Sequence, residues 1–246
     1  MHTHELGVRW SDLDPNRHLN NVMYVAYAEE ARAAMVDAGE LAAGETVSSV
    51  TVTFRQPLLL TRRPVLVTSE RTDDALVPDI VIDGESGRTS FARVSSSLGP
   101  PADLEAVDVP TVGVPCLLRR SDLDEHGAAT VTGLFDLIQE GRTRYAAEHR
   151  ASFPSDALVL GRMTVRLGAP VAWRSEHYTV RSWISKVSGA LVQIESEVLD
   201  GATVHAHAAS VHVPFDIATQ RSRRLTPEER DRLASLVVPV AGDVGL

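Results

Sequence analysis

Ser11-Asp12-Leu13-Asp14 decides how this sequence is organised, because the same four residues recur as Ser121-Asp122-Leu123-Asp124, at an offset of 110 residues. The flanking segments match at the same offset, and the matched pairs are Glu30 with Glu140, Arg32 with Arg142, Tyr24 with Leu134 and Tyr27 with Leu137. A repeat that keeps one register through a loop and the segment after it indicates two copies of one architecture.

A Pro-rich, acidic stretch separates the two copies. It runs Gly99-Pro100-Pro101-Ala102-Asp103-Leu104-Glu105, a composition typical of domain linkers. We therefore predict an N-terminal domain over 1–98, a linker over 99–113, a C-terminal domain over 114–224, and a C-terminal helix and tail over 225–246. Thr226-Pro227-Glu228-Glu229 has the capping-box pattern that starts such a helix, and the residues through Leu246 are expected to be loosely ordered.

Each copy shows the same order of elements. In the first copy a short strand (about Glu5 to Trp10) precedes a polar turn and one long helix (about Asn20 to Ala38), and Gly39 is a typical helix stop. The helix has an apolar stripe at three-to-four spacing, formed by Tyr24, Ala28, Ala31 and Met35. Alternating runs then predict antiparallel strands over 50–54, 64–68, 80–82 and 89–94.

The helix is rich in alanine, which allows a curved sheet to approach its backbone closely. This favours the hotdog arrangement, in which an antiparallel sheet wraps around one long central helix. The predicted fold class is α+β, with two tandem hotdog domains.

Composition excludes several classes of function. A 43% hydrophobic and 23% charged chain is a folded globular protein, and a net charge of −9 argues against nucleic-acid binding. The only lysine, Lys186, follows Ser185, so a Walker A phosphate loop is excluded. No apolar run approaches a membrane span, Met1 to Trp10 lacks signal-peptide features, and the single Cys116 suits a reducing compartment. We expect a cytoplasmic protein with no membrane partner.

The segment Val8 to Tyr24, with the sequence VRWSDLDPNRHLNNVMY, resembles the signature of the 4-hydroxybenzoyl-CoA thioesterase-like hotdog family. In that family a strand containing arginine leads to an Asp-x-Asp turn, then His-x-Asn-Asn, then a helix with Tyr and paired acidic residues. Asp12 to His18 is also similar to plant acyl-ACP thioesterases, which are themselves tandem hotdogs. The resemblance implies a thioesterase that acts on acyl-CoA, with acyl-ACP as the second carrier, and that requires no cofactor.

The resemblance also assigns roles to particular residues. Asp14 would be the catalytic carboxylate, as general base or nucleophile, and Asn16 and His18 match the residues that accompany it in the plant enzymes. The backbone N–H groups around Asn20 and Asn21, at the helix N-terminus, would hold the oxyanion. The chemistry agrees, because thioester hydrolysis needs a base near the carbonyl and fixed donors where negative charge develops. A helix N-terminus also favours negative charge.

The sequence departs from these patterns in two places. Phe54-Arg55-Gln56-Pro57 lacks the further acidic residue that the plant enzymes carry after the helix. The second copy keeps Asp124, but 125–130 has lost His-x-Asn-Asn. We expect one competent site per chain, with the second half as a pseudo-dimer partner that shapes the acyl pocket. Further pairing into a homo-oligomer is compatible with the fold.

Other interpretations stay open at this stage. The chain resembles hotdog hydratases less, because their Asp and His are five residues apart and Asp14 and His18 are four apart. A non-catalytic acyl-CoA-binding module is a further alternative. Asp14 or Asn20 would then only form a turn or cap the helix. His205, His207 and His212 have a spacing that can bind zinc, but we predict no metal site.

Overall fold

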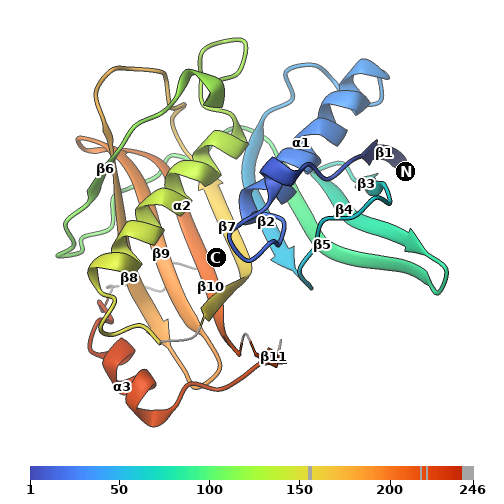
Figure 1. The fold of residues 1–246 in the computed structure, drawn as a ribbon. Coiled ribbons are helices and arrows are strands. Elements are labelled where there is room, and N and C mark those ends of the chain that lie inside the picture. The colour runs from blue at the N-terminus through green and yellow to red at the C-terminus, as the bar shows by residue number, and fades with distance from the viewer. Residues whose placement is uncertain (155–156, 217, 220, 240–246) are drawn as a thin grey trace. The chain divides into compact units, whose positions relative to one another are not determined.

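The computed structural model describes residues 1–154, 157–216, 218–219 and 221–239. The chain divides into two compact units, Met1–Pro101 and Ala102–Leu246 (Figure 1). Each unit is an antiparallel sheet with one long helix packed on it, which is the α+β hotdog arrangement predicted from the repeat. The expectation that the last residues are loosely ordered concerns a segment outside the described residues.

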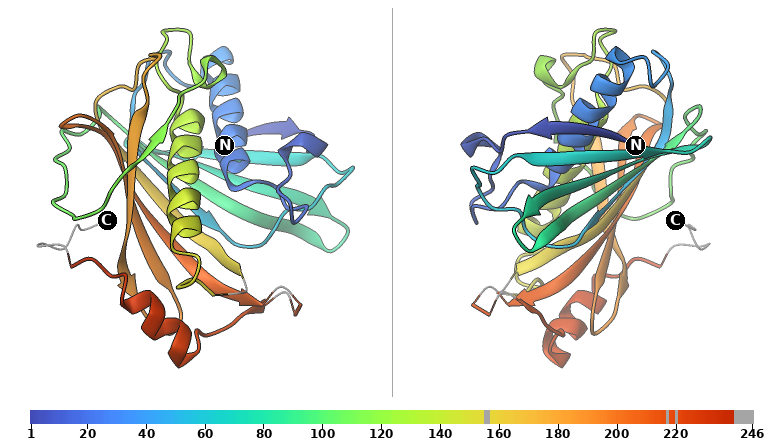
Figure 2. Two further views of the ribbon diagram at one scale, coloured as in Figure 1. Left: turned by 60° about the vertical axis from the view of Figure 1, so that its left-hand side comes forward. Right: turned by 90° about the vertical axis from the view of Figure 1, so that its right-hand side faces the viewer.

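The first unit contains the elements β1 (His2–Leu6), a short 3-10 helix η1 (Trp10–Asp12), α1 (Asn21–Asp37), β2 (Val47–Phe54), β3 (Val65–Arg71), β4 (Ala75–Gly84) and β5 (Gly87–Leu98). Within this unit the strand order is β1-β3-β4-β5-β2, and each neighbouring pair is antiparallel. The helix α1 packs against β1, β3, β4 and β5 (Figure 2).

The apolar stripe predicted for the first helix is its buried face. Tyr24, Ala28, Ala31 and Met35 are all buried, and Ala31 is completely so. The methyl side chains of Ala28 and Ala31 allow the helix backbone to lie close to the valine-rich sheet, in which Val52 and Val67 are also fully buried. Removal of this apolar surface from water is the main force that holds helix and sheet together.

The first predicted strand was placed too far along the chain. The observed strand is His2–Leu6, and Trp10 begins η1 instead. The backbone N–H of Arg9 donates to Oδ2 of Asp12 at 2.8 Å, which closes a turn and ends the extended backbone. Trp10 is 81% exposed.

The second unit contains the elements β6 (Val114–Cys116), η2 (Arg120–Asp122), α2 (Val131–Glu148), β7 (Ala157–Leu167), β8 (Tyr178–Val187), β9 (Val192–Asp200), β10 (Thr203–Asp216), β11 (Arg221–Ser222) and α3 (Pro227–Ala234). Its strand order is β7-β10-β9-β8-β6, and β11 pairs with β10. The helix α2 packs against β6, β8 and β9. The contact is tight at Gly141, where an added Cβ would lie 2.2 Å from Cγ1 of Val180.

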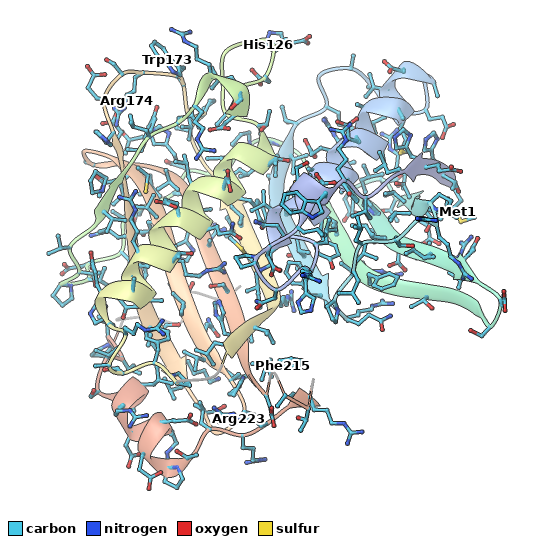
Figure 3. All side chains as sticks on the ribbon, in the orientation of Figure 1. Met1, His126, Trp173, Arg174, Phe215 and Arg223 are labelled. Atoms are coloured by element: carbon cyan, nitrogen blue, oxygen red, sulfur yellow. The ribbon has the colours of Figure 1, made fainter. Side chains whose placement is uncertain are left out.

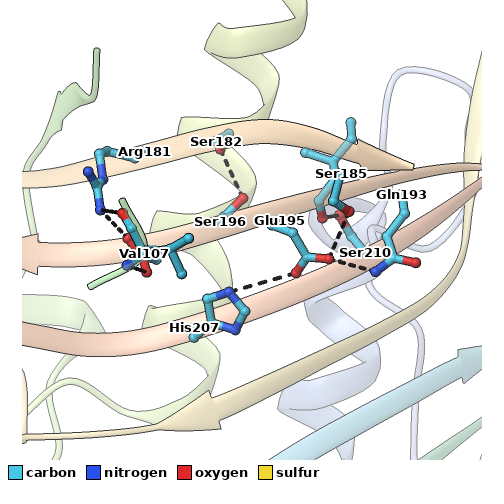
Figure 4. Close-up of polar contacts among 11 residues, drawn as sticks. Val107, Arg181, Ser182, Ser185, Gln193, Glu195, Ser196, His207 and Ser210 are labelled. Carbon is cyan, nitrogen blue, oxygen red and sulfur yellow. Dashed lines mark hydrogen bonds and ion pairs between the residues drawn. The ribbon is translucent and has the colours of Figure 1, made fainter. Parts of the chain in front are cut away.

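The segment predicted as a linker is attached to the second unit by backbone hydrogen bonds. Ala102 N–H donates to the Leu167 carbonyl at 2.8 Å, and Val107 N–H donates to Oε1 of the buried Glu197 at 2.9 Å. Arg181 bridges to both Glu197 and the Val107 carbonyl (Figure 4). The chain from Ala102 to Val107 is therefore hydrogen-bonded to the sheet of the second unit.

The C-terminal helix predicted from Thr226 is confirmed. Thr226 Oγ1 accepts from Glu229 N–H at 3.2 Å, and the Glu229 carboxylate accepts from Thr226 N–H at 2.8 Å, which completes the capping box.

Among the described residues, no helix is long and apolar enough to span a bilayer.

Candidate active site

The loop that carries the predicted site is closed around the carboxylate of Asp14. Its Oδ1 accepts from the backbone N–H of Asn16 at 2.8 Å and from that of His18 at 2.9 Å. The Asp14 N–H also donates to the His18 carbonyl at 2.7 Å. Arg17 takes a left-handed backbone with φ 63° so that the chain can turn back within this short span.

The second copy builds the same loop from a different sequence. Oδ1 of Asp124 accepts from the N–H of His126 and of Ala128, both at 2.9 Å. Gly127, with φ 80°, occupies the position of Arg17. His126, which matches Asn16, is exposed and is labelled in Figure 3. The aspartate therefore has a structural role in both copies, whatever chemistry the first copy performs.

The second oxygen of Asp14 differs from the first in having no protein donor. None of the described residues donates a hydrogen bond to Oδ2, and the residue is only half-buried. One oxygen is thus fixed by two backbone N–H groups, and the other remains accessible to water or a ligand. A carboxylate in this state can accept a proton without rearrangement of the loop.

The structure brings Asn16 and His18 to Asp14 through their backbones. Within the described part of the chain, neither side chain makes a hydrogen bond; Asn16 is exposed and His18 is half-buried. The His18 backbone is also bridged to Leu59, and the Leu19 N–H donates to the Leu58 carbonyl at 2.7 Å. These contacts hold the loop against the segment that follows β2.

At the start of α1, Asn20 is the N-cap. Its Oδ1 accepts from Val22 N–H at 3.1 Å, and its own N–H donates to the Asp12 carbonyl at 2.8 Å. Because that N–H is already bonded, it is not free for the oxyanion role expected of Asn20. The first residue of the helix, Asn21, is the member of the pair whose N–H lies at the positive end of the helix.

Sequence reasoning missed a buried contact that anchors the site loop to the helix. Asp12 is only 7% exposed, and the Tyr27 hydroxyl donates to its Oδ2 at 2.8 Å. Burial and the Asp12 carboxylate both raise the pKa of Tyr27 above its usual range, so the phenol stays protonated as the donor. The second copy has Leu137 in place of Tyr27, and that substitution is the available sequence signal that only the first loop is tied down in this way.

Tyr24 lies on α1, and its hydroxyl connects the helix to the segment that follows β2. Its hydroxyl accepts from Leu58 N–H at 3.1 Å, and its ring meets Phe54 edge-on. Burial raises the pKa of Tyr24 to about 12, and the negative charge of Asp14 contributes to the increase. Tyr24 is therefore a neutral core residue whose hydroxyl lies within the electrostatic reach of Asp14.

Among the described residues, the paired acidic residues of the helix, Glu29 and Glu30, form no hydrogen bond or ion pair with this loop. Burial raises the pKa of Glu29, and the charge of Arg32 opposes that shift. Eight residues separate Glu29 from Asn21, which corresponds to about 12 Å along the helix. Glu29 therefore lies about two helical turns from the N-terminal donor at Asn21.

The three histidines with zinc-like spacing have different neighbours. The His205 ring contacts the Ala169 carbonyl at 2.8 Å, and His207 lies 3.8 Å from the Glu195 carboxylate (Figure 4). His212 is buried beside Arg142. In the described ranges, no three His, Cys, Asp or Glu side chains gather as metal ligands would.

Comparison with known proteins places this geometry in context. Residues 8–85, most of the first unit, match the family model described as the thioesterase-like superfamily. No curated protein matches the chain significantly.

Several solved structures share the fold over nearly the whole chain. One is described, provisionally, as an oleoyl thioesterase from Lactobacillus plantarum; its TM-score is 0.68 at 12% identity, over 87% of this chain and 96% of that one. The 12:0-ACP thioesterase from Umbellularia californica has a TM-score of 0.66 at 12% identity, over 86% and 93%. An acyl-ACP thioesterase from Bacteroides thetaiotaomicron has a TM-score of 0.58 at 11% identity, over 85% and 96%. The first unit is thus similar to the thioesterase-like superfamily over residues 8–85, and the chain as a whole has the tandem hotdog fold.

Proposed function

We propose that this protein hydrolyses acyl thioesters at the loop around Asp14. The observation that carries the proposal is the division of labour within one carboxylate: Oδ1 is fixed by the N–H groups of Asn16 and His18, and Oδ2 is left open. Asn21 begins the adjoining helix and supplies a backbone donor at its positive end. A base and an oxyanion donor on one short segment are the two elements that thioester hydrolysis requires.

In the proposed reaction, Oδ2 of Asp14 takes a proton from a water molecule as that water attacks the thioester carbonyl. The carbonyl oxygen becomes an oxyanion, which the Asn21 N–H stabilises. The C–S bond then breaks, the carboxylic acid is released, and the proton held by Asp14 passes to the departing thiolate. A single well-placed oxyanion donor lowers such a barrier by about 3 kcal/mol.

His18 and Asn16 take supporting roles in this proposal. In this proposal the half-buried His18 ring orients the attacking water, and the exposed Asn16 amide offers donors to the substrate. The second copy has Ala128 where the first has His18, so Asp124 keeps the loop shape without these partners. We therefore propose one working site per chain.

The proposed substrate is an acyl-CoA, with acyl-ACP as the second candidate carrier. The second candidate is supported by the solved structures that match nearly the whole chain, since two of them are named as ACP thioesterases. The alternative of a non-catalytic acyl-CoA-binding module is supported by the recurrence of the loop geometry at Asp124, where we propose no reaction.

Thiol release from matched substrates tests the proposal. The full chain is incubated with one acyl group presented on CoA and on ACP, for a short, a long, a branched and an aromatic acyl group. Release of thiol well above the uncatalysed rate is expected, and the preferred carrier is the one with the higher kcat/KM. Tight acyl-CoA binding without thiol release from any substrate would refute hydrolysis and leave the binding module.

A further inference from the structure

The second unit contains a buried guanidinium without a counter-charge. Arg142 lies on α2, is only 8% exposed, and its Nη1 has no hydrogen-bond partner. No side chain or carbonyl among the described residues forms a hydrogen bond or an ion pair with Arg142. Burial lowers the pKa of Arg142 to about 10, so the group still carries its charge at neutral pH.

In the first unit the matching arginine has an acidic neighbour on its own helix. Arg32 matches Arg142, and its Nη2 donates to the Glu45 carbonyl at 2.5 Å. Glu29, one helical turn earlier, lies close enough for the charge of Arg32 to oppose the increase in its pKa. On α2 the residue that matches Glu29 is Gln139, which carries no charge. The second copy has therefore kept the cation and lost the anion.

His212 is the other titratable side chain facing Arg142. It comes from β10, is 6% exposed, and its Nδ1 is buried without a partner. Burial and the nearby charge of Arg142 hold the pKa of His212 well below its ordinary value, so the ring is neutral. Glu140, the acidic neighbour on the same helix, is exposed and paired with Arg144. Nothing described in this unit offsets the charge on Arg142.

A folded protein does not normally bury an unpaired charge, because loss of hydration is offset only by an opposite charge or strong hydrogen bonds. A buried guanidinium with an unpartnered Nη1, close to the unpartnered Nδ1 of His212, offers donors to an anion. The guanidinium presents a planar fork of donors that matches a carboxylate in bidentate geometry. With the ring neutral, one cation is available, which suits a monoanion better than a phosphate dianion.

We propose that Arg142 and His212 bind the carboxylate of a monocarboxylic acid with an apolar tail. The tail is argued from the helix itself, because Ile138 and Tyr145, one turn before and one turn after Arg142 on α2, are buried apolar residues. The identity of the natural ligand rests on the proposed function, since hydrolysis of an acyl thioester releases this class of acid. The site would then bind the product within the second unit, whereas the loop around Asp14 belongs to the first unit.

Binding of sodium octanoate, followed by calorimetry with the full chain, tests the inference. Arg142→Met removes the charge at similar length, and Arg144→Met on the same helix is the matched control. Octanoate is expected to bind wild type and the Arg144 variant alike, and to bind Arg142→Met at least about tenfold more weakly, the loss of one charged hydrogen bond. Octanol, which lacks the charge, is expected not to discriminate between the three proteins.

A second variant keeps the test independent of folding defects. Gln139→Glu restores the acid found at the matching position of the first copy, so it should raise the melting temperature without ligand and weaken octanoate binding. Equal octanoate affinity in wild type, Arg142→Met and Gln139→Glu would overturn the proposal, as would absence of binding to wild type. Because binding needs no turnover, a failure here is separable from a failure of thioester hydrolysis.

Discussion

The two aspartates that close the repeated loops allow structure and chemistry to be separated by mutation. In both copies one carboxylate oxygen accepts two backbone N–H groups at 2.8–2.9 Å. Asp14→Ala and Asp124→Ala each leave those two N–H groups without their acceptor. Both variants are therefore expected to lose stability, although only the first copy is proposed to catalyse a reaction.

The size of the loss follows from the exposure of the loops. A hydrogen bond to a charged group contributes about 1.5–3 kcal/mol when its donor would otherwise be left unpaired. Here water reaches both loops and replaces part of each bond, so we expect about 1–3 kcal/mol for either variant. Asp14 is half-buried and Asp124 is exposed, so the loss should be somewhat larger at Asp14.

Urea denaturation followed by circular dichroism measures both losses, and thiol release is measured on the same samples. Asp124→Ala should unfold at lower urea but retain turnover under folding conditions. Asp14→Ala should show a comparable shift and also lose turnover. The reasoning is refuted if Asp124→Ala is as stable as wild type, or if it abolishes turnover while remaining folded.

Two further predictions concern backbone conformation in the two loops and helix packing in the second unit. Gly127→Ala places a side chain on a left-handed residue with φ 80° and should lower the free energy of unfolding by about 1–2 kcal/mol. Arg17→Gly, at φ 63° in the first copy, should change that free energy by less than about 1 kcal/mol. A Gly127→Ala variant as stable as wild type would contradict this reasoning. Gly141→Ala should destabilise by about 1–3 kcal/mol in thermal unfolding, because its Cβ would lie 2.2 Å from Cγ1 and 2.6 Å from Cβ of Val180. A Gly141→Ala variant as stable as wild type would contradict this packing.

The fold was predictable because its signals are local and repeated. The helix predicted over Asn20 to Ala38 is observed as Asn21–Asp37, since an N-cap and a C-terminal glycine mark its ends in the sequence. The strands run longer than predicted, as in β5 over Gly87–Leu98, because the serines near its end interrupt the apolar alternation while the backbone pairing continues.

Contacts between distant residues could not be predicted in the same way. The Asp14 loop was identified from its motif, but the bond from Tyr27 to Asp12 and the commitment of the Asn20 N–H depend on how helix and turn meet in space. The lack of a hydrogen-bond partner for Arg142 Nη1 likewise depends on which side chains pack around it in the folded chain. In hindsight, the change from Glu29 to Gln139 between the copies is the sequence signal for it.

The central claim is that a single carboxylate, Asp14, performs the hydrolysis. The most direct test compares kcat/KM for thiol release by wild type, Asp14→Asn and Asp124→Asn on the best substrate of the panel. Asparagine keeps an oxygen that can accept both backbone N–H groups, so both variants should stay folded. Asp14→Asn is expected to lose about 100-fold or more, as for removal of a general base, while Asp124→Asn stays near wild type. Undiminished hydrolysis by folded Asp14→Asn, or an equal loss in both variants, would contradict the account.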